Sequence, residues 1–195
     1  MLFIFDMGGV VTNTFELDSM VKQIGISKED FWNICKNGQR NFWDEFQKGL
    51  IGINEFWTLF NENSEKYNFK KVMHDYFRLN FNPVRKNLTV EMIQKLKQKH
   101  RVVCGTNTIQ SHYENHMECG DYLIFNKTYA SNKIQAIKPD SDFFQLIMNA
   151  EGFLPSETFF VDDKIENCEA AKKLGINTVH FICEKDLFDE WKKYF

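Results

Sequence analysis

The chain has 195 residues and a net charge of −3, and 43% of its residues are hydrophobic. This length suffices for one core domain with a modest insertion. Binding to nucleic acid or to an anionic membrane calls for a basic surface stripe, which this weakly acidic composition does not indicate, so we expect neither partner.

The cysteines and the N-terminal segment indicate a reduced, cytoplasmic protein. The five cysteines are scattered and form no C-x-x-C pair, which argues against a disulfide framework. The apolar run of residues 2–5 is too short for a signal peptide. No apolar stretch approaches the roughly 18 residues that a membrane-spanning helix needs.

The first predicted element is a buried strand over residues 2–5, which ends at Asp6 and a pair of glycines. Residues 14–82 have a different pattern, with aromatic side chains at helical spacing. They predict a small, aromatic-rich helical bundle. The first strand lacks partner strands within this bundle, so we assign it to a sheet formed later in the chain.

Start and stop signals divide the bundle into helices. Ser27 with Asp30 three positions later resembles a capping box and predicts a helix through Cys35. The other predicted helices cover residues 42–49, residues 54–60 with Asn54 as the N-cap, and residues 70–79.

After Pro83, strands and helices alternate. The expected helices cover residues 89–99, 141–150 and 165–174, with a last one around residues 187–191. The expected strands cover residues 101–104, 129–130, 158–161 and 178–181. Such alternation is typical of an α/β fold with a doubly wound parallel sheet. The predicted core is residues 1–13 with 83–195, and residues 14–82 form a helical insertion after the first strand.

Polar residues follow several predicted strands, at the edge where open parallel sheets bind ligands. Each could be an ordinary turn residue, helix cap or surface charge, but their order along the chain favours one site. They are Asp6, Thr106, Asn107, Asp162 and Asp163, with Lys138 in a loop that reaches the same edge.

These residue types predict a metal-assisted phosphoryl site. Crowded carboxylates disfavour ionisation, and Mg²⁺ relieves the conflict because it takes carboxylate, water and phosphate oxygens as ligands. A lysine with hydroxyl and amide donors can hold the other phosphoryl oxygens. Asp6 is then free to attack phosphorus and form an aspartyl-phosphate, which water hydrolyses.

Four segments resemble, in order, the motifs of the haloacid dehalogenase superfamily and of its phosphatases: residues 3–10, 102–108, 138–144 and 160–175. The resemblance implies a Rossmann-like core and a helical cap over residues 14–82. It also implies the roles of individual residues. These are Asp6 as nucleophile and metal ligand, Thr106 and Lys138 as phosphate-binding residues, Asp163 as the preferred metal ligand, and Asp162 and Asn167 as supporting residues.

One position departs from the family pattern. Most of its phosphatases carry a second Asp, a general acid and base, where this chain has Gly8. The Gly8 carbonyl can still face magnesium, but glycine cannot donate a proton, a function worth about 10²- to 10⁴-fold. The chain in this respect resembles the branch of bacterial α-D-glucose-1-phosphate phosphatases, which implies a small sugar phosphate as substrate. Asp44, Glu45 or an ordered water is the expected proton source.

The segment from Arg40 to Lys48 is where the resemblance places substrate selectivity, with Trp43 and Asp44 as its further candidates. Aromatic residues at helical spacing, here Phe42, Trp43, Phe46 and Trp57, more often form a core than a substrate platform. His112, His116 and Cys119 have a zinc-like spacing, but structural zinc takes four ligands, so a surface helix is the preferred interpretation, with a role for His112 at the edge of the pocket left open.

Two other functions are kept beside the phosphatase. A 2-haloacid dehalogenase also lacks the second Asp, but needs no metal, so the pair Asp162 and Asp163 argues against it. A catalytically silent relative that binds a phosphorylated ligand or a protein is the other alternative. Gly8 and Asn167 favour it, whereas Asp6 and Lys138 favour an active enzyme.

Overall fold

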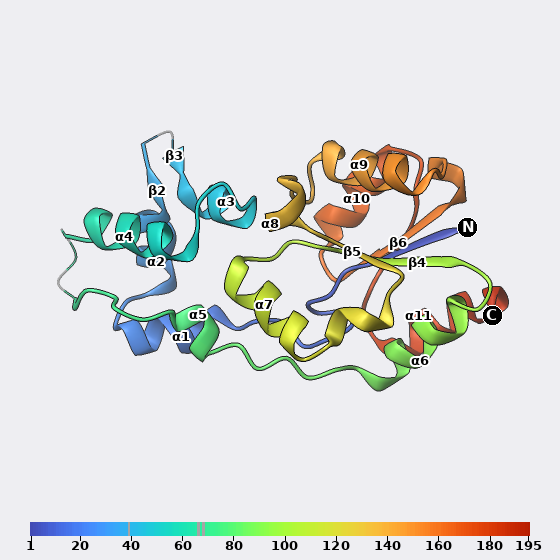
Figure 1. The fold of residues 1–195 in the computed structure, drawn as a ribbon, viewed down its shortest axis with the longest axis horizontal. Helices are drawn as coiled ribbons and strands as arrows, with labels where there is room; N and C mark the ends of the chain where they lie inside the picture. The colour runs from blue at the N-terminus through green and yellow to red at the C-terminus, as the bar shows by residue number, and fades with distance from the viewer. Residues whose placement is uncertain (39, 66, 68) are drawn as a thin grey trace.

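The structure is a computed structural model that describes residues 1–38, 40–65, 67 and 69–195. At its centre is a five-stranded sheet in the order β5–β4–β1–β6–β7 (Figure 1). The strands are β1 (Leu2–Phe5), β4 (Arg101–Thr106), β5 (Lys127–Ala130), β6 (Thr158–Asp162) and β7 (Asn177–His180). Every neighbouring pair in this sheet is parallel. The prediction of a doubly wound parallel sheet that includes the first strand is confirmed.

Helices cover both faces of this sheet (Figure 1). They are α6 (Asn87–Leu96), α7 (Gln110–Glu118), α8 (Ser131–Ile134), α9 (Ser141–Glu151), α10 (Ile165–Lys173) and α11 (Glu184–Trp191), with short 3₁₀ turns η1 (Asp121–Ile124), η2 (Pro155–Glu157) and η3 (Lys192–Tyr194).

The central strand β1 explains why both faces need cover. Because side chains alternate along a strand, Phe3 and Phe5 join the cluster formed with α6 and α11, whereas Leu2 and Ile4 join the cluster formed with α9 and α10. All four side chains are fully buried. Burial of each contributes about 1.5–3 kcal/mol, so this apolar strand is stable only in the middle of a two-sided layer.

Residues 14–82, called the inserted region below, follow β1 in the chain and precede the other strands of the sheet. They supply most of a third hydrophobic cluster. The elements of this region are α1 (Leu17–Ile24), α2 (Lys28–Cys35), β2 (Lys36–Asn37), β3 (Arg40–Asn41), α3 (Phe42–Gln47), α4 (Ile53–Asn63) and α5 (Tyr76–Leu79). Phenylalanines dominate its centre, and Phe46 stacks on Phe56 with their ring centroids 4.6 Å apart. The expectation that most aromatic residues here form a core agrees with this packing.

Two local predictions for the inserted region were wrong, and one feature was missed. The missed feature is the antiparallel pair β2–β3. Helix α4 begins at Ile53 after Gly52, so Asn54 lies inside the helix rather than at its cap. Residues 70–75 are not helical, because the side chain of Asn61 hydrogen-bonds both the N–H and the C=O of Val72, each at 2.8 Å.

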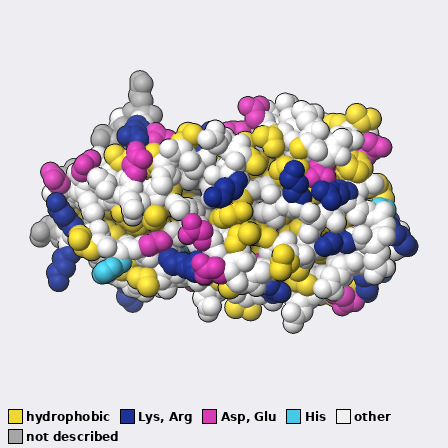
Figure 2. All heavy atoms as spheres, viewed as in Figure 1, with side chains coloured by type: hydrophobic (Ala, Val, Ile, Leu, Met, Phe, Trp, Pro, Cys, Tyr) yellow, Lys and Arg dark blue, Asp and Glu magenta, His cyan; other side chains and the backbone are white. Residues whose placement is uncertain are grey.

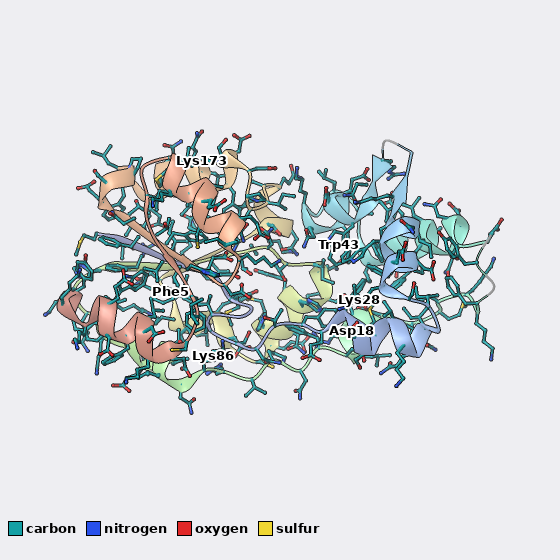
Figure 3. The ribbon with its side chains drawn as sticks, turned by 180° about the vertical axis from the view of Figure 1, so that it is seen from behind. Phe5, Asp18, Lys28, Trp43, Lys86 and Lys173 are labelled. Carbon is teal, nitrogen blue, oxygen red and sulfur yellow. The ribbon has the colours of Figure 1, made fainter. Side chains whose placement is uncertain are left out.

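The surface carries both signs of charge. Figure 2 shows Lys and Arg side chains together with Asp and Glu, with hydrophobic side chains between them. One of the ion pairs of the inserted region joins Lys28 to Asp18 at 2.6 Å (Figure 3). Among the described residues, every helix falls short of the length and apolar character that crossing a bilayer demands.

Candidate active site

A cavity of about 180 Å³ lies where the carboxyl ends of β1 and β4 meet. Asp6 directly follows β1, and its amide donates to the carbonyl of Val161 in β6 at 3.0 Å. On the other side of β1, Thr106 ends β4. Seven of the site residues predicted in the core line this cavity together: Asp6, Gly8, Thr106, Asn107, Lys138, Asp163 and Asn167.

The ammonium group of Lys138 is the electrostatic centre of the site. It lies 2.8 Å from an oxygen of Asp6 and 2.6 Å from an oxygen of Asp162, and the side chain is only 1% exposed. Burial by itself lowers the pKa of Lys138, but the two carboxylates outweigh burial and raise it. Lys138 is therefore a permanent buried cation that can bind a phosphoryl oxygen.

Asn107 positions the backbone of this lysine. Its Nδ2 donates to the carbonyl of Lys138 and its Oδ1 accepts from the Lys138 amide, both at 2.8 Å. Sequence reasoning placed Asn107 directly on phosphate. In the structure Asn107 lines the cavity, and its amide group joins the end of β4 to the backbone of Lys138. No local sequence pattern indicated this pairing.

Asp162 is a fully satisfied carboxylate behind the cavity. One oxygen accepts from Nδ2 of Asn167 at 3.0 Å and from the Lys164 amide at 2.8 Å, and the other accepts from Lys138. The side chain is completely buried and does not line the cavity. Asp162 and Asn167 thus hold Lys138 and the loop after β6 in place, in keeping with the supporting role expected for them.

Asp163 has the opposite character. Its Oδ1 is buried without a hydrogen-bond partner among the described residues. Burial raises the pKa of Asp163, and the neighbouring Asp162 raises it further. Oxygen atoms of Asp6, Asp162 and Asp163 lie within 4.8 Å of one another. A buried acceptor beside a second carboxylate is the donor set that a magnesium ion takes, so these residues fit that metal.

The nucleophile candidate Asp6 is affected by the same crowding. Burial raises its pKa to about 6, with further contributions from Asp162 and Asp163, although the charge of Lys138 opposes the increase. A cation bound beside Asp6 would favour its ionised form.

Two adjacent glycines differ in what they permit. A Cβ at Gly9 would lie 2.2 Å from Oδ2 of Asp163, and the residue has a φ of +83°, so only glycine fits. A Cβ at Gly8 would meet nothing within 4 Å. Gly8 therefore has room for a Cβ atom, whereas Gly9 has none.

The inserted region contributes Trp43 and Gln47 to the cavity wall. Figure 3 shows Trp43 on the part of this region that is nearest to the sheet. Among the candidates for selectivity, Trp43 alone of Arg40, Trp43, Asp44 and Lys48 lines the cavity. Sequence reasoning missed Gln47, which lies one helical turn after Trp43 on the same face.

The charged candidates for selectivity form hydrogen bonds and ion pairs with residues outside the cavity wall. Arg40 makes a bidentate contact with Glu45, and Asp44 accepts from Asn41 at 2.8 Å. Lys48 lies 3.5 Å from Asp140, so it joins the inserted region to the start of α9. The structure therefore brings neither of the expected proton donors, Asp44 and Glu45, to the cavity.

The zinc-like spacing in α7 does not produce a metal centre among the described residues. Nδ1 of His116 lies 2.7 Å from a carboxylate oxygen of Asp121, and Cys119 is exposed. The expected surface helix was wrong in part, because His116 is buried and both histidines line the cavity.

A family model for haloacid dehalogenase-like hydrolases matches residues 1–175, which is most of the chain. The chain belongs to the haloacid dehalogenase-like hydrolase family. This assignment agrees with the parallel sheet and with the acidic cluster at its edge.

Several solved structures have a similar fold. A family enzyme from Bacteroides thetaiotaomicron, solved with magnesium and inorganic phosphate, is 26% identical, with a TM-score of 0.73 over 91% of this chain and 92% of that one. A predicted family hydrolase from Porphyromonas gingivalis is 24% identical, with a TM-score of 0.73 over 91% and 89%. A dehalogenase is 17% identical, with a TM-score of 0.64 over 97% and 96%.

A curated relative is a much longer protein. The drimenol cyclase DrtB of Aspergillus calidoustus is 26% identical over 151 residues, which are 71% of this chain but 27% of that protein. The chain thus spans about a quarter of the length of this relative.

Proposed function

We propose that this protein is a magnesium-dependent phosphatase that hydrolyses a small sugar phosphate through an aspartyl-phosphate on Asp6. The observation that carries the proposal is the buried oxygen of Asp163, which has no hydrogen-bond partner in the described part of the chain and lies beside Asp6 and the cationic Lys138. A metal-free dehalogenase has no use for such an oxygen, whereas a site for a cation and a phosphoryl group needs it.

In the proposed reaction, Asp6 is the nucleophile, and Lys138 and Thr106 bind the phosphoryl group. The carboxylate of Asp6 attacks phosphorus, forming a bond from its oxygen to phosphorus while the bond from phosphorus to the alcohol oxygen breaks. Lys138 and the hydroxyl of Thr106 bind phosphoryl oxygens that carry the developing charge. Water then attacks the aspartyl-phosphate, which releases inorganic phosphate and restores the Asp6 carboxylate.

Asp6, Asp163 and the carbonyl of Gly8 would hold the magnesium ion. When bound, the ion neutralises negative charge on the phosphate and on these carboxylates. Gly9 keeps the space that Asp163 occupies, because any side chain at this position would displace its carboxylate.

The size and lining of the cavity support a small polar substrate. A volume of about 180 Å³ suits a small molecule, and its wall combines Trp43 with polar groups such as Gln47. The family enzyme from Bacteroides thetaiotaomicron was solved with magnesium and inorganic phosphate, which supports the reaction type. The resemblance to glucose-1-phosphate phosphatases makes a hexose 1-phosphate the first choice.

This choice also suits the missing acid at Gly8. The anomeric oxygen of a sugar is a better leaving group than an ordinary alkoxide, so protonation by the enzyme matters less. With Asp44 and Glu45 outside the cavity wall, water is the proton source that we propose.

A screen of phosphorylated metabolites with and without Mg²⁺ tests the proposal, with Asp6→Asn as the control. We expect magnesium-dependent release of phosphate from sugar phosphates and none from the variant. Turnover of a 2-chloroacid that survives EDTA would identify a dehalogenase. A protein that is inert towards the whole panel, with its fold intact, would be the silent relative.

A further inference from the structure

Lys86 is a partly buried lysine that the proposed mechanism leaves without a role. It lies where the chain returns from the inserted region to the core, immediately before α6. Its ammonium group donates a hydrogen bond to the carbonyl oxygen of Gly9 and lies 4.5 Å from the centre of the Phe181 ring. Figure 3 shows Lys86 in the same part of the molecule as Phe5, the last residue of β1.

No carboxylate accounts for the position of this ammonium group. Among the described residues, other basic side chains form the ion pairs, and Lys86 takes part in none of them. Its contacts are instead a backbone carbonyl and the face of an aromatic ring. An ammonium group has three donors and no acceptor, so it is suited to holding a carbonyl oxygen in place.

Gly9, the residue that Lys86 holds, lies between two proposed magnesium ligands. It is buried and directly follows Gly8, whose carbonyl is one of them. Its backbone borders the carboxylate of Asp163, since a Cβ at Gly9 would lie 2.2 Å from Oδ2 of that residue. Both polar backbone groups of Gly9 are bonded. The N–H donates to the carbonyl of Thr12 at 2.8 Å, and the C=O accepts from Lys86.

These two bonds determine the direction of the Gly8 carbonyl. The C=O of Gly8 and the N–H of Gly9 belong to one planar, trans peptide unit and point in opposite directions. The bond from Gly9 to Thr12 therefore sets the direction of the Gly8 carbonyl, and the bond from Lys86 holds the next peptide unit. Without the ammonium group this next unit can rotate, which shifts both the Gly8 carbonyl and the backbone that borders Asp163.

The segment around Lys86 is held in place without its side chain. The backbone N–H of Lys86 donates to the carbonyl of Val11 at 2.8 Å, and the N–H of Asn13 donates to the carbonyl of Val84 at 3.1 Å. These backbone bonds join the two segments whatever side chain follows Arg85. The ammonium group adds a contact closer along the chain to Asp6, so what it adds is the placement of Gly9.

We propose that Lys86 is a positioning residue for the magnesium site: by holding the Gly9 carbonyl, it keeps the Gly8 carbonyl and the Asp163 carboxylate in the arrangement that binds the ion. This inference rests on the phosphatase function proposed above. It adds a residue outside the cavity wall that determines how tightly the metal binds. Groups that orient metal ligands typically contribute about 10- to 100-fold to metal affinity.

The test compares three variants with the wild type. Lys86→Met keeps an aliphatic side chain but has no donor, and Lys86→Arg restores a cationic donor. Lys133→Met is the matched control, because the Lys133 ammonium also lies over an aromatic ring, 4.8 Å from the centre of Tyr113, but in α8 rather than beside Gly9. Titration calorimetry on the metal-free proteins measures the affinity for Mg²⁺ directly, and circular dichroism measures folding.

We expect Lys86→Met to bind Mg²⁺ about 10- to 100-fold more weakly than the wild type. Lys86→Arg should recover most of the affinity, and Lys133→Met should keep all of it. The inference is overturned if Lys86→Met keeps the wild-type affinity, even when it is less stable. It is also overturned if Lys86→Arg binds as weakly as Lys86→Met, or if Lys133→Met loses as much.

A spectroscopic measurement decides the matter if Lys86→Met does not fold. In the wild type, the ¹⁵N signal of the Lys86 ammonium group should shift when Mg²⁺ is added, whereas that of Lys133 should not. An unchanged Lys86 signal would contradict the inference.

Failure of the proposed function is detected by a different assay. A wild type that binds Mg²⁺ but releases no phosphate from the panel of esters would overturn the function alone, and the comparison of affinities would still decide the role of Lys86. A wild type that binds no Mg²⁺ would overturn both.

Discussion

The sheet core and the inserted region use their polar residues in opposite ways. In the core, Asp6, Lys138 and Asp163 lie at the ends of strands or in adjoining loops and meet inside one buried site. In the inserted region, Arg40 and Asp44 pair with neighbours a few residues away, and Trp43 with Gln47 faces the cavity. The proposed function assigns the chemistry to the core and the shape of the substrate space to the inserted region, in line with this contrast.

The largest expected effect concerns the nucleophile. Asp6→Asn should lower turnover of the preferred phosphate ester by about 10⁴-fold or more, because an amide cannot form the aspartyl-phosphate. Steady-state kinetics with Mg²⁺ measures this, and circular dichroism controls for folding. A variant that keeps its rate would show that the core does not supply a covalent nucleophile.

The buried cation should matter for stability as well as for activity. Lys138→Met leaves Asp6 and Asp162 uncompensated and should cost about 3–5 kcal/mol in the free energy of unfolding. Lys48→Met is the matched control, because it removes a lysine from the partly exposed pair with Asp140 and should cost about 0–1 kcal/mol. Urea denaturation without metal compares them. If the two variants lose equal amounts of unfolding free energy, the buried lysine of the core is no more important for stability than the partly exposed one.

The two glycines after Asp6 test the metal site. Gly9→Ala should weaken the activation by Mg²⁺ by about 10- to 100-fold, because its Cβ would displace the carboxylate of Asp163. Gly8→Ala adds a Cβ into open space and is the matched control, with little change expected. The measurement is the magnesium concentration at half-maximal activity. A similar shift in both variants would argue against Asp163 as a ligand.

His112 lies at the junction of the two regions, in contact with Phe81. Its environment predicts that the stability of the folded protein decreases in acid. The pKa of His112 is about 3 when folded and about 6.5 when unfolded. Because the unfolded chain binds the proton more tightly, stability is complete above pH 6.5 and declines as the pH falls towards 3.

Between pH 6.5 and pH 5, the wild type should therefore lose about 2 kcal/mol more than His112→Phe. Denaturation with urea at the two pH values measures the difference. If both proteins lose the same free energy of unfolding, His112 does not have a lowered pKa in the folded state, and the prediction is wrong.

The smallest effect is expected for the inserted region. Trp43→Phe keeps an aromatic ring in the cluster but removes part of the cavity wall. We expect KM for a sugar phosphate to rise by about tenfold, with a smaller change for acetyl phosphate, which does not reach this wall. An equal loss of kcat for both substrates would show that Trp43 affects the chemical step. The proposed separation of roles between the core and the inserted region would then be wrong.

Sequence patterns predicted the core well because its signals are local. The apolar strand that ends at Asp6 and the strand that ends at Asp162 are each visible within a few residues. Parallel strands bring their carboxyl ends to one edge wherever they occur in the sheet, so the order of these segments sufficed to gather Asp6, Thr106 and Lys138. No such rule predicts where the charged candidates of the inserted region point, and the structure places them away from the cavity.

The sequence by itself determined the class of fold, the identity of the acids at the sheet edge and the absence of an acid at Gly8. Tertiary structure decided which polar atoms are satisfied. It paired Asn107 with the backbone of Lys138, and it left Nε2 of His112 and Oδ1 of Asp163 without hydrogen-bond partners among the residues that the structure describes. Those outcomes depend on residues far apart in the chain meeting at hydrogen-bond distance, which no local pattern of side-chain types encodes.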